Sequence, residues 1–285
     1  MRWDQGHQSN NVDDRRGAGG AGGGGGRRPG LKLGLGGIVI VGILSLVLGR
    51  DLLTPLLSGE VGGAAAGPAT APAGDDTLAR FVSFVLDDTQ ATWRAQFTQR
   101  GRTYTDARLV LFTSQVSTAC GDADSGTGPF YCPADQQAYI DLSFYQELRQ
   151  RFGAPGDFAQ AYVLAHEIGH HVQHLIGTDT WMRGQQAANP SRENELSVRL
   201  ELQADCYAGI WAHSTNQRQL LEAGDVDEAL AAASAIGDDT LQRQARGRVR
   251  PDTFTHGTSA QRVQWFRQGL ASGQIESCDT FSGSI

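Results

Sequence analysis

Four of the chain's seven histidines lie in one apolar segment, AYVLAHEIGHHVQHLIG, at residues 161–177. Within it, HEIGH places His166 and His170 four residues apart, which on an α-helix puts both imidazoles on one face. Two neutral imidazoles at this spacing suit Zn²⁺. Glu167 is turned far enough round the helix to hold a water at the metal without binding the metal itself. The motif therefore predicts zinc-assisted hydrolysis, with Glu167 as the catalytic base.

A second apolar segment, SRENELSVRLELQADCYAGIWAH, supplies a third ligand. It contains Glu201 and Asp205 four residues apart within an apolar pattern of helical spacing. Burying two carboxylates beside each other costs free energy unless a cation or a proton donor compensates them. Zinc bound by Glu201, with Asp205 accepting the second ring N–H of a ligand histidine, would compensate both. We therefore predict one zinc ion per chain, bound by His166, His170 and Glu201 and positioned by Asp205.

Two further histidines leave other ligand sets open. A metzincin site would need a third histidine six residues after His170, where the chain has Ile176. His174 could join a site built from three histidines of one helix, but side chains on successive turns diverge and one metal rarely takes three of them. We expect His171 and His174 to lie outside the set of ligands, in contact with it or on the surface.

Helices are expected around both motifs. The first runs over residues 157–176, where Asp157 and Gln160 have the spacing of a capping box and Gly177 follows the last periodic residue. The second runs over residues 191–213.

The second helix has its N-cap candidate in Ser191, after Pro190. Before the first helix, residues 107–112 and 139–145 have the residue types and pattern of short strands. These helices and strands must position the metal ligands.

Composition excludes one class of partner. The formal net charge is −7, and beyond the N-terminal tail there is no dense run of Lys and Arg. A nucleic-acid-binding protein needs a basic face to neutralise phosphates, so we expect no nucleic-acid partner.

The first 76 residues differ in composition from the rest. Residues 1–30 are polar and glycine-rich, so we expect a disordered cytoplasmic tail, because such a segment has too little apolar surface to offset the entropy of ordering. Residues 31–49, LKLGLGGIVIVGILSLVLG, are apolar over about the length that crosses a bilayer as a helix. Residues 50–76 have the Gly, Ala and Pro content of a linker. The folded domain is expected over residues 77–285.

Basic residues set the expected orientation of this single membrane span. They precede it at Arg15, Arg16, Arg27, Arg28 and Lys32, and after Arg50 none occurs before Arg80. By the positive-inside rule the N-terminus lies in the cytoplasm and the C-terminal domain outside the cell membrane. A buried core helix and a cleaved signal peptide are the alternatives. The unequal number of basic residues on the two sides of the segment argues against a buried core helix. The lack of a clear AxA site beside the apolar run argues against a cleaved signal peptide.

The four cysteines agree with an exported domain, because an even number in an oxidising compartment usually pairs. Cys120 and Cys132 bracket a turn-rich loop that a disulfide could hold closed. Cys206 and Cys278 would then connect a helix to the C-terminus. No closely spaced CxxC pairs exist for a zinc ribbon.

HEIGH followed by ELQAD resembles the gluzincin metallopeptidases. More closely, the chain resembles the "putative neutral zinc metallopeptidase" family of bacteria, through MRWDQGHQSNNVDDRRG, the single membrane span, VLFTSQVSTACG, GPFYCP, YIDLSFYQEL, LAHEIGHHVQHLIG, LELQADCYAGIWAH and FTHGTSAQRVQWF. The resemblance implies an α+β zincin fold with a small antiparallel sheet and active-site helices. It also implies a substrate peptide laid along an edge of that sheet.

One more segment, THGTSAQR, is similar to the part that follows the zinc site in the heat-shock membrane-protease branch of gluzincins. The similarity implies catalytic roles for His256 and Arg262, facing the developing oxyanion or fixing the site. Gly257 stands where a proline is usual in that branch. A surface histidine and a salt-bridging arginine are the alternative.

These observations predict a membrane-anchored zinc metalloendopeptidase that acts on peptides or proteins outside the cytoplasmic membrane through a zinc-bound water. The alternative is a non-hydrolytic, zinc-stabilised interaction or regulatory module of the cell envelope. A structural zinc site would need a fourth protein ligand, which His174 or Cys206 could supply, and it would not need an acid at the position of Glu167.

Overall fold

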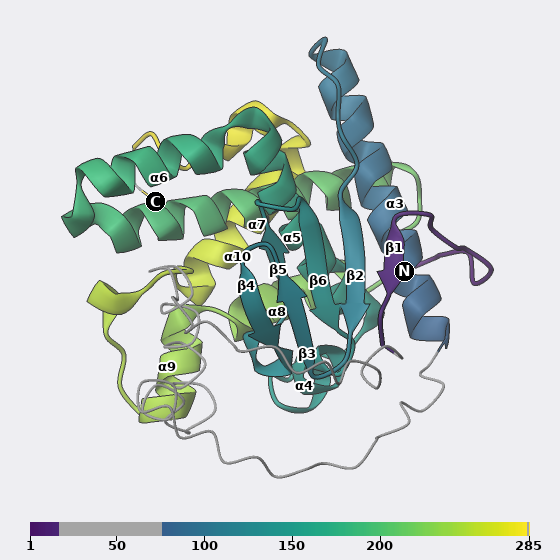
Figure 1. The fold of residues 1–285 in the computed structure, drawn as a ribbon, viewed down its shortest axis with the longest axis horizontal. Helices are drawn as coiled ribbons and strands as arrows, with labels where there is room; N and C mark the ends of the chain where they lie inside the picture. Colours follow the sequence, from purple (N-terminus) through teal and green to yellow (C-terminus); the bar gives the residue numbers. More distant parts are fainter. Residues whose placement is uncertain (17–75, 284) are drawn as a thin grey trace, which may run out of the picture.

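The computed structural model describes residues 1–16, 76–283 and 285, which form a mixed sheet packed against helices (Figure 1). The elements are β1 (Val12–Asp14), α3 (Asp76–Gln99), β2 (Arg108–Phe112), β3 (Gln115–Thr118), β4 (Gly121–Asp124), β5 (Phe130–Cys132), β6 (Gln137–Asp141), α4 (Phe144–Gln150), α5 (Asp157–Ile176), α6 (Thr178–Ala188), α7 (Glu193–Gln217), α8 (Asp225–Ala235), α9 (Asp238–Arg246) and α10 (Ser259–Ser272). Short 3₁₀ turns occur at Ser125–Thr127, Pro190–Arg192, Pro251–Thr253 and Ile275–Cys278. The α+β class predicted from the sequence is confirmed.

The main sheet has four strands in the order β1-β2-β6-β5. β1 is parallel to β2 and β2 is parallel to β6, whereas β5 is antiparallel to β6. Only β3 and β4, which form a separate pair, are antiparallel throughout. The expected small antiparallel sheet is therefore wrong for the main sheet. Residues 113–136 give the chain room to return from β2 into a parallel β6, and alternation within single strands does not reveal strand direction.

Helix α5 lies at the centre of the domain. It contacts α3, α7 and α8, and it also meets strands β5 and β6. Its predicted range, 157–176, is confirmed. The expected capping box is wrong, because Gly156 is the N-cap and the carboxylate of Asp157 accepts hydrogen bonds from the amine of Met1.

Helix α7 begins two residues later and ends four residues later than the predicted range of 191–213. Residues Pro190–Arg192 form a 3₁₀ turn before it. The predicted N-cap, Ser191, is wrong, because it lies within this turn and Arg192 is the N-cap of α7. α7 packs closely against α10: a Cβ added to Gly269 would lie 1.9 Å from the carbonyl oxygen of Cys206. This close approach lets side chains of α10 reach residues buried on α7.

Both predicted disulfides are present. Cys120 pairs with Cys132, with Cα atoms 5.8 Å apart, and Cys206 pairs with Cys278, with Cα atoms 5.7 Å apart. The first holds the end of β5 to the β3–β4 hairpin. The second fastens the C-terminal 3₁₀ turn to α7.

The N-terminal residues pack on the domain. Residues 12–14 form β1 at the edge of the main sheet beside β2, and the Met1 side chain is buried in the main core. The expected disorder of residues 1–30 is therefore wrong for residues 1–16. Met1 and Trp3 pack on the core, and the glycine-rich average composition of residues 1–30 gave no sign of this apolar contribution. Residues 17–30 lie outside the described residues.

The predicted membrane span at residues 31–49 also lies outside the described residues, as does the predicted linker apart from Asp76, which begins α3. Among the helices of residues 1–16, 76–283 and 285, none is long and apolar enough to cross a membrane.

Candidate metal centre

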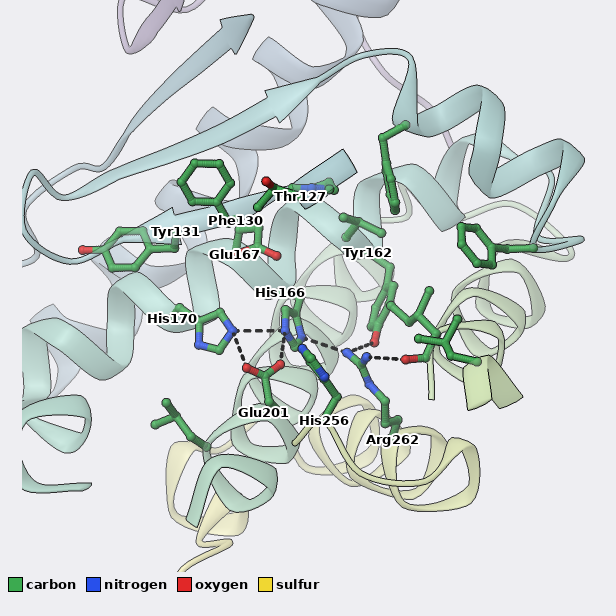
Figure 2. Close-up of a pocket in the computed structure, with 18 of the residues that line it drawn as sticks. Thr127, Phe130, Tyr131, Tyr162, His166, Glu167, His170, Glu201, His256 and Arg262 are labelled. Atoms are coloured by element: carbon green, nitrogen blue, oxygen red, sulfur yellow. Dashed lines mark hydrogen bonds and ion pairs between the residues drawn. The ribbon is translucent and has the colours of Figure 1, made fainter. Parts of the chain in front are cut away.

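Three side chains from two helices converge on one point. His166 and His170 come from α5 and Glu201 comes from α7 (Figure 2). The Nε2 atoms of the two histidines are 3.2 Å apart, and Glu201 places one oxygen 3.1 Å from His166 and the other 3.5 Å from His170. The ligands predicted from HEIGH and ELQAD are thus brought together.

Gly169, inside HEIGH, allows this convergence. A Cβ added there would lie 3.0 Å from the carbonyl oxygen of Ala204 on α7, closer than most real Cβ contacts. The two helices can therefore approach at this residue, which lies three residues after His166 and directly before His170. A larger side chain at position 169 would push α7 and Glu201 away from the histidines.

Hydrogen bonds fix which nitrogen of each histidine faces the centre. His166 Nδ1 is 2.8 Å from an oxygen of Asp205, and His170 Nδ1 is 2.8 Å from Oε1 of Gln173. In the neutral ring that a metal requires, each Nδ1 donates to these oxygens, so each Nε2 presents a lone pair. Two lone pairs and a carboxylate then point at one place, which is unfavourable without a cation.

The spacing also fits zinc. A tetrahedral ion with bonds of about 2.0–2.1 Å separates its ligand atoms by roughly 3.3–3.4 Å. The two Nε2 atoms lie 3.2 Å apart, and each has a different oxygen of Glu201 at 3.1 or 3.5 Å, so all three separations are close to that value. The donor set of two imidazoles and one carboxylate is one that catalytic zinc uses.

Asp205 lies behind His166 and is fully buried. Its oxygens accept from His166 Nδ1, from the Tyr162 hydroxyl at 2.5 Å and from Arg262 at 2.8 and 2.9 Å. Burial opposes its charge, but Arg262 and His166 outweigh burial and lower the pKa of Asp205 to about 2. Asp205 is thus the charged partner of the ligand histidine, as the sequence predicted.

Arg262 has the position of a residue that fixes the site, the second of the two roles that the sequence similarity implied. Its guanidinium is 3% exposed and donates to Asp205, to the hydroxyl of Tyr162 and to the carbonyl of Ile236. All three nitrogens have a protein acceptor. Arg262 is therefore a residue that holds Asp205 in place, and a role at the oxyanion stays a prediction for His256.

Glu167 lies beside the ligands and is 7% exposed. In Figure 2 its carboxylate lies on the side of the imidazoles that faces Thr127 and Phe130. Burial raises the pKa of Glu167, although the neighbouring histidines act against that rise. A carboxylate whose pKa is raised accepts a proton from water more readily than an ordinary one.

His256 reaches the same cavity from the loop before α10. Its Nδ1 is 3.3 Å from Asp238, whose carboxylate also accepts the backbone N–H groups of Thr255, His256 and Gly257. Burial favours neutral imidazole, but Glu201 and Asp238 outweigh it and raise the pKa of His256. The raised pKa favours a protonated ring, which can donate from Nε2 into the cavity.

The two other histidines have protein partners. His171 contacts the carbonyl of Thr105 through Nε2 at 2.7 Å and the hydroxyl of Tyr131 through Nδ1 at 2.9 Å. His174 pairs with Asp179 at 3.0 Å. Neither belongs to the converging ligand atoms, as expected.

Sequence reasoning missed three residues of the site. Tyr162 stands four residues before His166 and Gln173 three after His170, so both share a helix face with a ligand and the spacing was a usable signal. Asp238 had no such signal, because it lies 18 residues before His256, at the start of α9, whereas His256 lies in a loop.

A cavity of about 430 Å³ opens over the ligands. Its polar lining includes His166, Glu167, His170, Glu201 and His256, and its apolar lining includes Phe130, Phe144, Phe152, Val163 and Leu241. The site thus combines ligands, an acid and apolar walls in one open space.

The sequence profile of the family described as "Putative neutral zinc metallopeptidase" matches residues 1–281. The chain belongs to this family. Within the neutral zinc metallopeptidase family, the protein YpfJ of Escherichia coli K12, named as uncharacterized, is 48% identical over 290 aligned positions that cover all of both chains. The protein Rv2575 of Mycobacterium tuberculosis H37Rv, also named as uncharacterized, is 47% identical over 192 positions, 64% of each chain. No solved structure matches this member of the family.

Proposed function

We propose that the chain is a zinc metalloendopeptidase that hydrolyses peptide bonds in extended segments of peptides or proteins. The observation that carries the proposal is the position of Glu167, a buried acid beside two converging Nε2 atoms and Glu201 in an open cavity. Zinc held by His166, His170 and Glu201 would supply a Lewis acid for water and for the scissile carbonyl. Family membership supports the metal and the reaction class.

The acid and base steps fall to the chain's own residues. Glu167 takes a proton from the attacking water on its carboxylate and passes it to the leaving amine. His256, held by Asp238, donates from its ring to the oxygen that becomes negative as the carbonyl is attacked. Asp205 and Gln173 keep the two ligand imidazoles in one tautomer throughout.

An extended substrate is proposed to lie along β5. This strand ends the described part of the main sheet on the side that meets α5, and Phe130 and Tyr131 line the cavity. A strand at the end of a sheet offers unpaired backbone groups to a peptide. The apolar walls near Phe144 and Phe152 favour an apolar substrate side chain.

A closed structural zinc site is the weaker alternative. Of the two residues that could have completed it, Cys206 is bonded to Cys278 and His174 is paired with Asp179. Among the described residues, the cluster around His166 and His170 contains Glu201 as its only further member. This arrangement supports a site with room for substrate.

We also propose that the domain works outside the cytoplasm. The two disulfides support this location, because disulfides persist in oxidising compartments. A membrane anchor over residues 31–49 stays a prediction.

The test uses the full chain, purified without reduction. We expect one zinc per chain, and cleavage of an unstructured peptide library with an apolar preference on one side of the cut. Glu167→Gln should keep the zinc and lower kcat/KM by about 10²–10⁴-fold, because the proton acceptor is lost. The matched control, Glu193→Gln, changes an exposed glutamate of α7. It should leave the zinc content and kcat/KM unchanged. Full activity in Glu167→Gln would remove this residue from its role.

A further inference from the structure

The two histidine ligands are held by different kinds of group. Nδ1 of His166 faces the carboxylate of Asp205. Nδ1 of His170 faces the neutral side-chain amide of Gln173, at 2.8 Å from its oxygen. An ionised carboxylate can only accept hydrogen bonds, whereas an amide carries an acceptor oxygen and a donor NH₂ group and could turn either toward a histidine. Other groups must therefore fix the orientation of Gln173.

Both N–H groups of Gln173 are committed to acceptors on α7. Its Nε2 lies 2.7 Å from the carbonyl oxygen of Leu200, the residue before the ligand Glu201, and 3.2 Å from Oε1 of Gln203. Gln173 is fully buried, so both contacts are shielded from solvent. With both N–H groups donated to α7, the oxygen of Gln173 is the group left to face His170.

The orientation of Gln203 is set in turn by a backbone carbonyl. Gln203 is 7% exposed, and its Nε2 donates to the carbonyl oxygen of Cys278 at 3.0 Å. A carbonyl oxygen can only accept, so Gln203 must offer it an N–H group, and its own oxygen then faces Gln173. The hydrogen bonds therefore form one directed chain, from Nδ1–H of His170 through two amides to Cys278. Reversal of either amide would place two acceptors against each other.

Several contacts hold the carbonyl of Cys278 in place. A disulfide joins Cys278 to Cys206, three residues after Gln203 on α7, and both cysteines are fully buried. Beyond the disulfide, the Thr280 hydroxyl donates to the carbonyl of Arg199 at 2.6 Å, and Arg199 donates back to the carbonyl of Thr280 at 2.5 Å. The acceptor at the end of the hydrogen-bond chain is thus fastened to the helix that carries the third ligand.

We propose that Gln203 is a positioning residue for the metal ligand His170, and that it passes the acceptor position of the Cys278 carbonyl to the His170 ring through Gln173. Zinc affinity then depends on the Cys206–Cys278 disulfide, which lies outside the ligand cluster. The inference rests on the zinc site of the proposed function, but it does not require that any peptide is hydrolysed.

Removal of the Gln203 amide tests the first step on the full chain. Gln203→Met keeps the length of the side chain but can neither accept from Gln173 nor donate to Cys278. We expect zinc affinity, measured by chelator competition, to fall about three- to tenfold, less than the roughly 10–100-fold typical of a group that contacts a ligand directly. Unchanged zinc affinity would overturn the proposal.

Gln242→Met, in α9, is the matched control. Gln242 is 9% exposed, donates one hydrogen bond, to Thr253 at 2.9 Å, and accepts one, from Arg250 at 2.8 Å. Its burial and its bonding therefore match those of Gln203. Both changes should lower Tm, but Gln242→Met should leave zinc affinity unchanged. An equal loss of zinc affinity in the two variants would reflect lower stability alone and would contradict the proposal.

The ring of His170 gives a signature that a merely structural role would not change. With zinc bound, its Nδ1–H proton can be followed by NMR in a chain labelled with ¹⁵N-histidine, which contains seven histidines. Gln203→Met should speed the exchange of this proton with solvent at least about fivefold, because Gln173 loses one of the two acceptors that orient it. The same exchange rate in variant and parent would show that Leu200 orients Gln173 alone, against the proposal.

Removal of the disulfide tests the last step. The double variant Cys206→Ala/Cys278→Ala should lose zinc affinity by a factor similar to that of Gln203→Met. Adding Gln203→Met to it should lower the affinity by less than about twofold further, because effects that pass through one contact do not add. The matched control, Cys120→Ala/Cys132→Ala, removes the other disulfide and should leave zinc affinity unchanged.

Two results with the disulfide variants would sink the proposal. One is an equal loss of zinc affinity from either disulfide, and the other is a full additional loss when Gln203→Met is combined with Cys206→Ala/Cys278→Ala. All these measurements are made without substrate. A chain that shows the expected changes in zinc affinity but cleaves no peptide would therefore contradict the proposed function and leave the role of Gln203 intact.

Discussion

His166 of α5 and Asp205 of α7 share a hydrogen bond of 2.8 Å between Nδ1 and a carboxylate oxygen, and Asp205 in turn binds Arg262 of α10. Three helices thus determine the orientation of one metal ligand. The bond between His166 and Asp205 fixes the tautomer that turns Nε2 toward Glu201. The candidate metal site therefore depends on residues outside the three converging side chains.

Replacing Arg262 by alanine should weaken both the fold and the metal site. Asp205 would lose the arginine that compensates its buried charge, which costs about 3–5 kcal/mol in the free energy of unfolding. Zinc affinity should fall by about 10–100-fold, because His166 loses its fixed orientation. Denaturant unfolding and chelator competition measure the two effects.

The control for this change is Arg267→Ala, which removes an exposed arginine from the same helix. It should leave stability and zinc affinity within error of the parent protein. If Arg262→Ala bound zinc as tightly as Arg267→Ala, Asp205 would not need Arg262 to hold His166.

Zinc affinity should rise with pH. In the metal-free site burial favours neutral His166, but Asp205 and Glu201 outweigh burial and raise its pKa from 6.5 to about 10. The proton on His166 stabilises the metal-free fold fully below pH 6.5, and this stability is lost as the pH rises toward 10. Zinc must displace that proton, so affinity should grow by up to about tenfold per pH unit within this window.

Chelator competition between pH 6.5 and 8.5 measures this dependence. The difference in Tm between zinc-loaded and metal-free protein should widen over the same range. An affinity that does not change with pH would mean that His166 is already neutral in the metal-free protein.

Tyr131→Phe should impair substrate binding more than chemistry. The hydroxyl of Tyr131 on β5 contacts Nδ1 of His171 on α5 at 2.9 Å, and the other ring nitrogen of His171 contacts the carbonyl of Thr105. Because Nε2 must donate to that carbonyl, Nδ1 accepts from the Tyr131 hydroxyl. Losing this bond frees the strand proposed to bind the substrate. We expect KM to rise several-fold with little change in kcat.

Tyr139→Phe is the matched control for this change. It removes a hydrogen bond of the same kind, to Asp135 at 2.8 Å, from the neighbouring strand β6. Its effect on KM should be small, because Tyr139 does not line the cavity. A larger fall in kcat than rise in KM for Tyr131→Phe would contradict a role in substrate binding.

Residues 1–16 should be labelled from the same side of the membrane as the domain, because β1 pairs with β2. Gln8→Cys and Asn216→Cys each place a thiol at an exposed position, one in the N-terminal segment and one at the end of α7. In intact cells a membrane-impermeant maleimide should label both or neither. Labelling of one position alone would mean that the membrane separates the two positions and would contradict this prediction. Permeabilised cells show that both thiols can react.

The sequence by itself determined the local parts of the site. The spacings of four between His166 and His170 and between Glu201 and Asp205 fix a shared helix face, because helical geometry repeats every 3.6 residues. The two disulfides were predicted from the even number of cysteines and from the short turn-rich loop that Cys120 and Cys132 bracket. These predictions required no knowledge of how helices pack.

The tertiary structure alone decided the rest. The sequence similarity left two roles open for Arg262, and the packing of α10 on α7 places it on Asp205, 57 residues away in the chain. Met1 was expected in a disordered tail but binds Asp157, 156 residues away. The parallel direction of β6 relative to β2 could likewise not be predicted from the pattern of residues within each strand. Such contacts depend on which buried charges the packed helices and strands bring together. The periodicity of the sequence reports only local structure, so it cannot predict contacts between distant residues.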